Sequence, residues 1–262
     1  SSLKFFGGKN AISPLTRVAI LNACSELIEY EQVSLSLEQM ASLEGVSREY
    51  LDPMSPALEN EGFYQFARLD YGYTGLVSAA DIDSFIAAYC EYSEGKYGVV
   101  STLREMGEAI ISAAQEYNVN EIYLMSHAIL ESAWGCSTLS QGKVDGYEGF
   151  YNFFGIGAYD ADPLNGGAYL AKEQNWDSPE AAIGGAAKWI SHNYFNNAYG
   201  QNTLYKMRWN YSQAMQEGAV WKQYATSPSW ATGIAEVMDS FYKMVGFSAD
   251  SAGLRYVVPV YE

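Results

Sequence analysis

The chain has 262 residues, of which 48% are hydrophobic, 15% aromatic and 18% charged, and its formal net charge is −16. This composition excludes an intrinsically disordered chain, which contains few aromatic residues and much more charge. The negative charge argues against nucleic acid and anionic lipid as partners, because nonspecific binding to either needs basic patches. No uninterrupted apolar run reaches the roughly 18 residues of a membrane span, so we expect no membrane segment.

The first half of the chain carries clear helix signals. Ser13 followed by Pro14 is a favoured N-cap and first helical residue, which predicts a helix over about 13–30. Ser36 and Gln39 have the spacing of a capping box. Further boundaries are a helix end at Gly45, helix starts at Ser78 and Asn120, and helix ends near Tyr117 and Trp134.

The second half begins with a segment of different character. Residues 136–165 are rich in Gly, Asp, Tyr and Phe, which favours short strands and turns. Helical signals return at the Ser-Pro pairs 178–179 and 227–228, and the last helix is expected to end near Gly246. The chain therefore reads as a mainly helical body with a small irregular or β insertion.

One carboxylate stands out in the stretch "LMSHAILESAWGCS", residues 124–137. Glu131 lies close to the expected helix end, where free carbonyl groups disfavour a negative charge, and its neighbours are apolar. Both effects should raise the pKa of the carboxyl. A carboxylic acid that stays protonated near neutral pH is what a general acid for glycosidic cleavage requires. The alternative is a glutamate at a helix end that simply reaches water.

Four blocks carry a resemblance to a known family: "NEIYLMSHAILESAWGCSTL", "YNFFGIGAYDADP", "GQNTLYKMRWN" and "QYATSPSWA". In this order they resemble the glucosaminidase domain of Gram-positive autolysins, which are peptidoglycan hydrolases of glycoside hydrolase family 73. The resemblance is strong over 118–262 and weaker upstream to about Glu29. Residues 1–28 stay an unplaced N-terminal helical extension, and 29–262 is the expected catalytic domain.

The resemblance implies an α+β, lysozyme-like fold, in which a mainly helical lobe faces a small β-lobe at about 136–165 across a substrate groove. It makes Glu131 the proton donor to the leaving sugar oxygen. A second carboxylate normally assists, and Asp160 in "AYDADP" is the first choice, with Glu148 second; either also fits a residue that only stabilises a turn. The family leaves another route open, in which the acetamido oxygen of the substrate is the nucleophile and Tyr224 of "YAT" helps to orient it.

The "NFFGI" block is expected to form the groove floor. The amide of Asn152 suits sugar hydroxyl or acetamido groups, Phe154 offers a ring face to a pyranose, and Gly155 permits a close approach of the backbone. Alternatively, Phe153 or Phe154 packs this segment onto the helical body. The remaining substrate-binding candidates are Tyr159, Glu148 and Trp209.

Metal and thiol chemistry fit the sequence poorly. His127 and Glu131 are four residues apart, but zinc needs three or four ligands and the only other histidine, His192, has no partner spacing. Cys136 has no motif that would pair it with a histidine. We therefore expect neither a metal nor a cofactor.

Taken with the resemblance, these features predict an endo-β-N-acetylglucosaminidase that cleaves the β-1,4 bond after N-acetylglucosamine in peptidoglycan glycan strands. The expected setting is cell separation in the wall of a Gram-positive bacterium, by a secreted monomer. Two alternatives are a muramidase of the same fold and a catalytically weak wall-binding module. An intact Glu131 favours an enzyme, since binding alone does not require a carboxyl in a disfavoured site.

Overall fold

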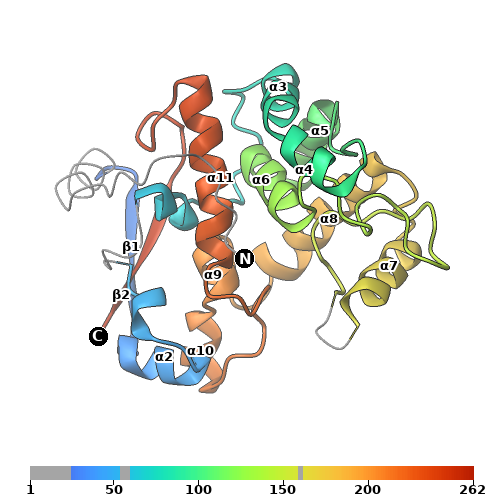
Figure 1. Cartoon of the computed structure of the whole chain (residues 1–262). Coiled ribbons are helices and arrows are strands. Elements are labelled where there is room, and N and C mark those ends of the chain that lie inside the picture. The colour runs from blue at the N-terminus through green and yellow to red at the C-terminus, as the bar shows by residue number, and fades with distance from the viewer. Residues whose placement is uncertain (1–24, 54–59, 159–161) are drawn as a thin grey trace.

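The structure is a computed structural model and describes residues 25–53, 60–158 and 162–262 (Figure 1). The longer helices are α2 (Leu37–Glu44), α3 (Ala79–Tyr89), α5 (Gly107–Tyr117), α6 (Glu121–Glu131), α7 (Pro163–Glu173), α8 (Pro179–Ile190) and α11 (Trp230–Val245). Shorter turns of helix are η1 (Arg48–Tyr50), η2 (Asn60–Phe66), α4 (Glu91–Tyr97), η3 (Ser191–Phe195), α9 (Leu204–Arg208) and α10 (Tyr211–Glu217). The strands are β1 (Ile28–Val33) and β2 (Tyr256–Tyr261).

The helix starts expected at Ser36, Ser78, Asn120 and Ser178 are confirmed by capping groups, but α11 begins at Trp230 and not at the expected pair 227–228. The Ser36 hydroxyl accepts a bond from the Gln39 N–H (3.2 Å), and the Gln39 side chain accepts one from the Ser36 N–H (2.8 Å). Ser78 and Asp81 form the same reciprocal pair at the start of α3. Asn120 caps α6 through its side-chain oxygen. Each such cap contributes about 1 kcal/mol of stability.

The expected helix over 13–30 is wrong where the structure describes it. Residues 1–24 lie outside the described part of the chain, but Ile28–Val33 form β1. This strand pairs in parallel with β2, with Ile28 opposite Tyr256. The partner strand lies at the other end of the sequence, so local helix signals could not reveal the pairing that overrides them.

The segment expected to contain short strands has turns instead. Over 136–158 the described chain forms turns and loops without a strand, and α7 begins at Pro163. Its turns rest on glycines with positive φ, among them Gly142, Gly149 and Gly155. The predicted turns are therefore confirmed and the predicted strands are wrong for 136–158, because no strand of the described residues lies beside this segment to pair with it.

Helix α6 is the central helix of the body, as its apolar faces predicted. Residues 121–129 are all buried, and α11 packs along α6 and η2 (Figure 1). The C-terminal end of α6 thereby meets the N-terminal end of α11. This crossing brings Glu131 to Trp230, which are far apart in the sequence.

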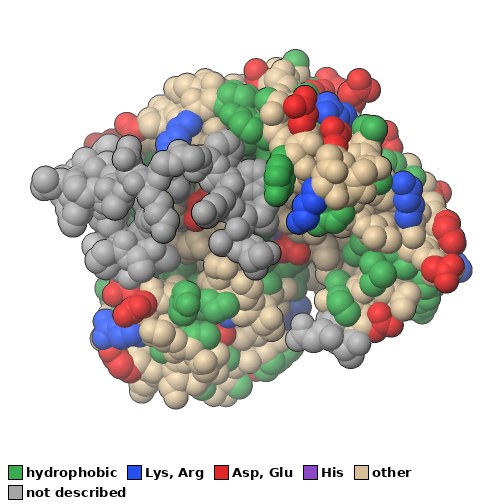
Figure 2. All heavy atoms as spheres, viewed as in Figure 1, with side chains coloured by type: hydrophobic (Ala, Val, Ile, Leu, Met, Phe, Trp, Pro, Cys, Tyr) green, Lys and Arg blue, Asp and Glu red, His purple; other side chains and the backbone are tan. Residues whose placement is uncertain are grey.

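Charged side chains lie mainly on the surface. Figure 2 shows Asp and Glu spread over the visible face with Lys and Arg between them, so the basic groups of this face do not gather into one patch. None of the helices in the described part of the chain is both long and apolar enough to cross a membrane.

Candidate active site

Glu131 is the last residue of α6, so the expected helix end at Trp134 is three residues too late. Its carboxyl oxygen Oε1 accepts a hydrogen bond of 2.8 Å from the indole Nε1 of Trp230. The residue keeps an accessible surface, yet the protein atoms packed around the carboxyl exclude much of the water. This desolvation raises the pKa of Glu131, and the weaker effect of the Trp230 bond lowers it. The expectation of a raised pKa is confirmed.

A strained turn holds Glu131 in place. Ala133 and Trp134 have positive φ values of 51° and 63°, which cost side-chain-bearing residues energy, and Gly135 follows at 74°. A Cβ on Gly135 would lie 2.8 Å from the backbone nitrogen of Leu103. The carbonyl of Gly135 also accepts bonds from the N–H and hydroxyl of Thr102 at 3.2 and 2.9 Å. The turn is thus clamped against the loop before α5.

The backbone of Gly155 lies directly beside the acid. Its φ is +65°, and a Cβ at this position would lie 3.2 Å from Oε2 of Glu131. The lack of a side chain at Gly155 thus leaves room for the Glu131 carboxyl, while the predicted approach of this backbone to a sugar stays a prediction. The second carboxyl oxygen faces this glycine, while the first is held by Trp230.

Asn152 builds the turn that carries Gly155 instead of facing a ligand. Its side-chain oxygen accepts from the Phe154 N–H (3.1 Å), and its amide donates to the carbonyls of Ile156 (2.8 Å) and Gly167 (3.2 Å). The residue is 2% exposed. Because the protein itself occupies both polar ends of the amide, the sugar-binding role predicted for Asn152 is wrong.

Tyr224 reaches the site from the loop between α10 and α11. Its hydroxyl donates a bond of 2.8 Å to the carbonyl of Phe154, and its ring stacks on Trp230 with centroids 4.9 Å apart. Burial raises the pKa of the phenol well above its usual range. Tyr224 is therefore a neutral phenol whose proton points at Phe154 and whose oxygen retains a free lone pair.

His127 lies one turn before Glu131 inside a cage of aromatic rings. Its Nδ1 is 3.0 Å from the Tyr123 hydroxyl, and the rings of Phe154, Tyr224 and Trp230 meet it edge to face. Burial lowers the pKa of His127 to about 3, so the imidazole is neutral. Among the described residues, no group of three potential metal ligands exists. His127 packs the floor beneath the acid.

Two further aromatic candidates are contradicted by their burial. Phe154 is fully buried, so its ring offers no face to a pyranose, and the alternative reading of a packing residue is correct. Trp209 is 1% exposed, with the Arg208 guanidinium 3.7 Å from its ring centroid. Glu148 is exposed on a turn. Tyr159 and Asp160 lie outside the residues that the structure describes.

Arg208 supports the loop that bears Tyr224. Its buried guanidinium pairs with Glu44 at 3.0 Å and donates to the carbonyls of Thr226 (2.7 Å) and Ser227 (2.8 Å). These bonds fix the chain just before Trp230. Sequence reasoning missed Arg208 and Trp230, although both lie in blocks that carry the resemblance, because their partners Glu44 and Glu131 come from distant segments.

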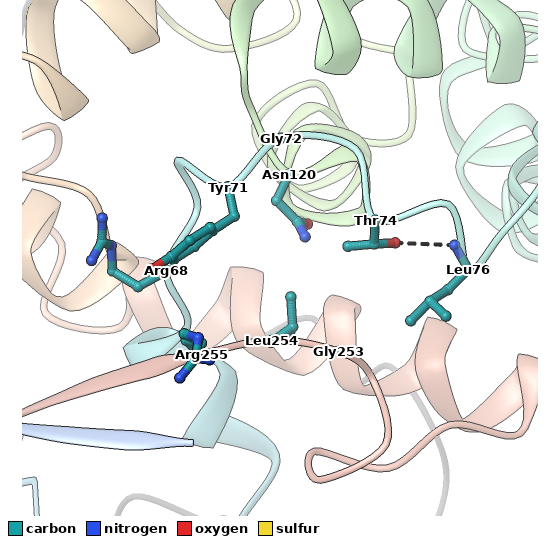
Figure 3. A pocket seen from close by; sticks show the side chains of 9 residues that line it. All are labelled: Arg68, Tyr71, Gly72, Thr74, Leu76, Asn120, Gly253, Leu254 and Arg255. Atoms are coloured by element: carbon teal, nitrogen blue, oxygen red, sulfur yellow. Dashed lines mark hydrogen bonds between the residues drawn. The ribbon is translucent and has the colours of Figure 1, made fainter. Parts of the chain in front are cut away.

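A separate pocket of about 210 Å³ lies at the opposite end of α6 (Figure 3). Arg68, Tyr71 and Asn120 are among its lining residues. Asn120 caps the N-terminus of this 11-residue helix, so the pocket is about 16 Å from Glu131. Arg68 is already paired with Asp70 at 2.6 Å. This pocket therefore contains none of the candidate catalytic residues predicted from the sequence.

Comparison with known proteins agrees with this geometry. The family model of the glucosaminidases, described as mannosyl-glycoprotein endo-beta-N-acetylglucosaminidase, matches residues 107–243. A beta-N-acetylglucosaminidase of Bacillus subtilis (strain 168) is 34% identical over 253 residues, which is 96% of this chain and 26% of the relative. A bifunctional autolysin of Staphylococcus aureus (strain MRSA252) is 32% identical over 98% of this chain and 21% of its own length. The chain thus spans about a quarter of these relatives.

Solved structures give the same answer for the fold. The crystal structure of a major bifunctional autolysin has a TM-score of 0.58 and 33% identity, covering 90% of this chain and 99% of that one. The structure of a catalytic mutant of S. aureus autolysin E in complex with the disaccharide NAG-NAM has a TM-score of 0.66 and 27% identity. The match covers 88% of this chain and 99% of that one. These neighbours confirm the lysozyme-like fold expected from the sequence. With the family model matched across the helices that carry Glu131 and Trp230, the chain belongs to the glucosaminidase family of glycoside hydrolases.

Proposed function

We propose that this domain is an endo-β-N-acetylglucosaminidase that hydrolyses the β-1,4 bond after N-acetylglucosamine in peptidoglycan. The observation that carries the proposal is the environment of Glu131, a carboxyl with a raised pKa, one oxygen on Trp230 and the other beside the Gly155 backbone. The names of the relatives support the substrate, since they are an N-acetylglucosaminidase and autolysins, and one neighbour was solved with NAG-NAM.

Glu131 acts as the general acid in this proposal. As the C1–O bond breaks, the carboxyl proton passes to the glycosidic oxygen and the electron pair of the bond leaves with that oxygen. The resulting carboxylate then accepts a proton from the water that attacks C1, which restores the acid. A raised pKa suits this cycle because the starting state is the protonated one.

Tyr224 assists by orientation and not as a charged nucleophile. Its raised pKa keeps the phenol neutral, and its proton is committed to the Phe154 carbonyl. The free lone pair of the phenol oxygen accepts the N–H of the 2-acetamido group, which turns the acetamido oxygen toward C1. Asp160, from the "AYDADP" stretch that resembles the family, is the proposed assisting carboxylate.

The biological setting is part of the same proposal. The relatives are autolysins and a glucosaminidase of Gram-positive bacteria, which supports a secreted enzyme that works on the cell wall during cell separation. The substrate is the glycan strand, and the domain acts as a monomer.

The test is a digest of purified peptidoglycan, reduced with borohydride and analysed by mass spectrometry. Fragments that end in reduced N-acetylglucosamine support a glucosaminidase. Fragments that end in reduced N-acetylmuramic acid would make the enzyme a muramidase with the same acid. An absence of new reducing ends would leave only a wall-binding module.

A further inference from the structure

The loop after α10 carries an exposed tryptophan that the protein holds in a fixed position. Trp221 is 64% exposed, whereas the other five tryptophans are buried or half-buried. Its indole Nε1 donates a bond of 2.9 Å to Oε2 of Glu217, and its ring meets Tyr199 edge to face with centroids 6.4 Å apart. The indole is thus held in one orientation although most of it is exposed.

A buried glutamine is devoted to this arrangement. Gln213 is fully buried, and its Oε1 accepts bonds from the N–H groups of both Trp221 (3.0 Å) and Lys222 (3.1 Å). Its Nε2 donates to Oε2 of Glu217 at 3.1 Å, the same oxygen that holds the indole. The Tyr199 hydroxyl donates to the other oxygen of Glu217. A ring ordered in advance loses little conformational entropy when a ligand binds.

A series of contacts leads from Lys222, the neighbour of Trp221 in the chain, through three aromatic rings to the acid. The ammonium of Lys222 lies 5.0 Å from the ring centroid of Tyr194, whose ring is 5.0 Å from that of Tyr224. Tyr224 in turn stacks on Trp230, which holds Glu131. Trp221 and Tyr224 are three residues apart, so the chain separates them by at most about 11 Å.

We propose that Trp221 forms an outer subsite of the glycan groove, in which the indole face stacks on a pyranose ring of the strand being cleaved. The proposal rests on the proposed function for the identity of the strand. Sugar rings present C–H groups on one face, which pack well on a flat aromatic surface that is partly free of water. The subsite adds affinity for long strands and takes no part in the reaction at C1.

The first measurement is binding, which does not depend on turnover. In the Glu131→Gln protein, acrylamide quenches the fluorescence of the exposed Trp221 most strongly. Long glycan strands released from peptidoglycan should protect it. Adding Trp221→Ala to Glu131→Gln should raise the dissociation constant for these strands about 3- to 10-fold. An unchanged dissociation constant, or strands that bind without any protection from acrylamide, would overturn the subsite.

The second measurement is kinetic and separates the subsite from the catalytic assignment. Trp221→Ala in the active protein should raise KM for long strands 3- to 10-fold with kcat unchanged, and leave the shortest cleaved oligosaccharide unaffected. Trp221→Phe retains a stacking ring, so its KM for long strands should rise less than that of Trp221→Ala. This variant shows whether the effect comes from the ring or from a disturbed loop. Tyr92→Ala is the matched control, because Tyr92 is 73% exposed on α4. An equal rise in KM for long and short substrates would contradict the subsite; no cleavage by the unaltered protein would contradict the proposed function alone.

Discussion

The indole Nε1 of Trp230 donates a hydrogen bond of 2.8 Å to Oε1 of Glu131, and this bond distinguishes the two oxygens of the carboxyl. An indole N–H is only a donor, so Oε1 has to present a lone pair to it. Because the carbonyl oxygen of a carboxylic acid accepts better than its hydroxyl oxygen, the bond favours the acid proton on Oε2, the oxygen beside the backbone of Gly155. The start of α11 thereby orients the group at the end of α6.

Replacing Trp230 with Phe should shift the pH profile of the enzyme. The Trp230 bond lowers the pKa of Glu131 against the larger effect of burial, so its loss leaves the pKa higher still. We expect the basic limb of kcat/KM to move up by about one pH unit, as the loss of a bond to a charged group implies. The pH dependence of kcat/KM measures this directly.

A tryptophan distant from the acid provides the control for Trp230→Phe. Trp176 is 2% exposed and packs against Gly185 in α8. Trp176→Phe should lower stability through lost packing and leave the pH limb in place. A limb that does not move in Trp230→Phe would show that the bond does not act on the titrating acid.

Glu131→Gln should remove activity and increase stability at neutral pH. The loss in kcat is expected to be about 10²- to 10⁴-fold, the usual contribution of a general acid. The pKa of the carboxyl is higher in the folded chain than in the unfolded chain. The protonated carboxyl of Glu131 therefore stabilises the fold fully at pH values below the pKa that the group has in the unfolded chain. This stabilisation is lost as the pH rises through the pKa that the group has in the folded chain.

Thermal unfolding at two pH values checks the stability half of that prediction. At pH 7 the uncharged Gln avoids the cost of ionising a desolvated carboxyl, so the Tm of Glu131→Gln should exceed that of the unaltered protein. Near pH 3, where both chains carry a neutral group, the two Tm values should converge. A Tm of Glu131→Gln below that of the unaltered protein at pH 7 would mean that Glu131 is held as a favourable charge, against the raised pKa.

Gly155→Ala tests the close approach of the backbone to the acid. The new Cβ would lie 3.2 Å from Oε2 of Glu131, on the side where the substrate oxygen has to come. We expect kcat/KM to fall by more than 100-fold. Gly149→Ala is the matched control: its φ is +83° and no atom lies within 4 Å of its added Cβ. Both variants carry the strain of a positive φ, so equal losses of activity would assign the effect to strain alone.

Tyr224→Phe should weaken catalysis and stability together. The buried carbonyl of Phe154 loses its donor, which costs about 1–3 kcal/mol, and the acetamido group loses the phenol oxygen. We expect kcat to fall about 10-fold or more, although the phenylalanine ring can still stack on Trp230. Tyr256→Phe removes a comparable bond, from its hydroxyl to the Ala249 carbonyl at 2.7 Å, and should lower stability while kcat stays normal. Similar kcat values for the two variants would argue against a role of Tyr224 in the reaction.

Features that depend on residues close together in the sequence could be predicted, and features that depend on distant residues could not. Ser36 and Asn120 revealed the starts of α2 and α6, because a cap bonds to groups only three residues away. The helix predicted over 13–30 overlaps the start of β1 (Ile28–Val33), and local signals cannot reveal this strand because its partner lies at the other end of the chain. The sequence leaves open whether Phe154 faces a sugar or packs inward, because a motif does not state which way a ring points, and burial decides for packing.

The sequence by itself determined the family, the central apolar helix α6 and the acid at its end, with the raised pKa that apolar neighbours impose. All of these depend on residue order and on periodicity within one helix. The tertiary structure alone decided that Trp230 holds one oxygen of Glu131, that Gly155 lies beside the other, and that Asn152 supports the loop instead of a sugar. Hydrogen bonds have short reach and strict direction, and their partners here come from segments that meet only when α6 packs against α11.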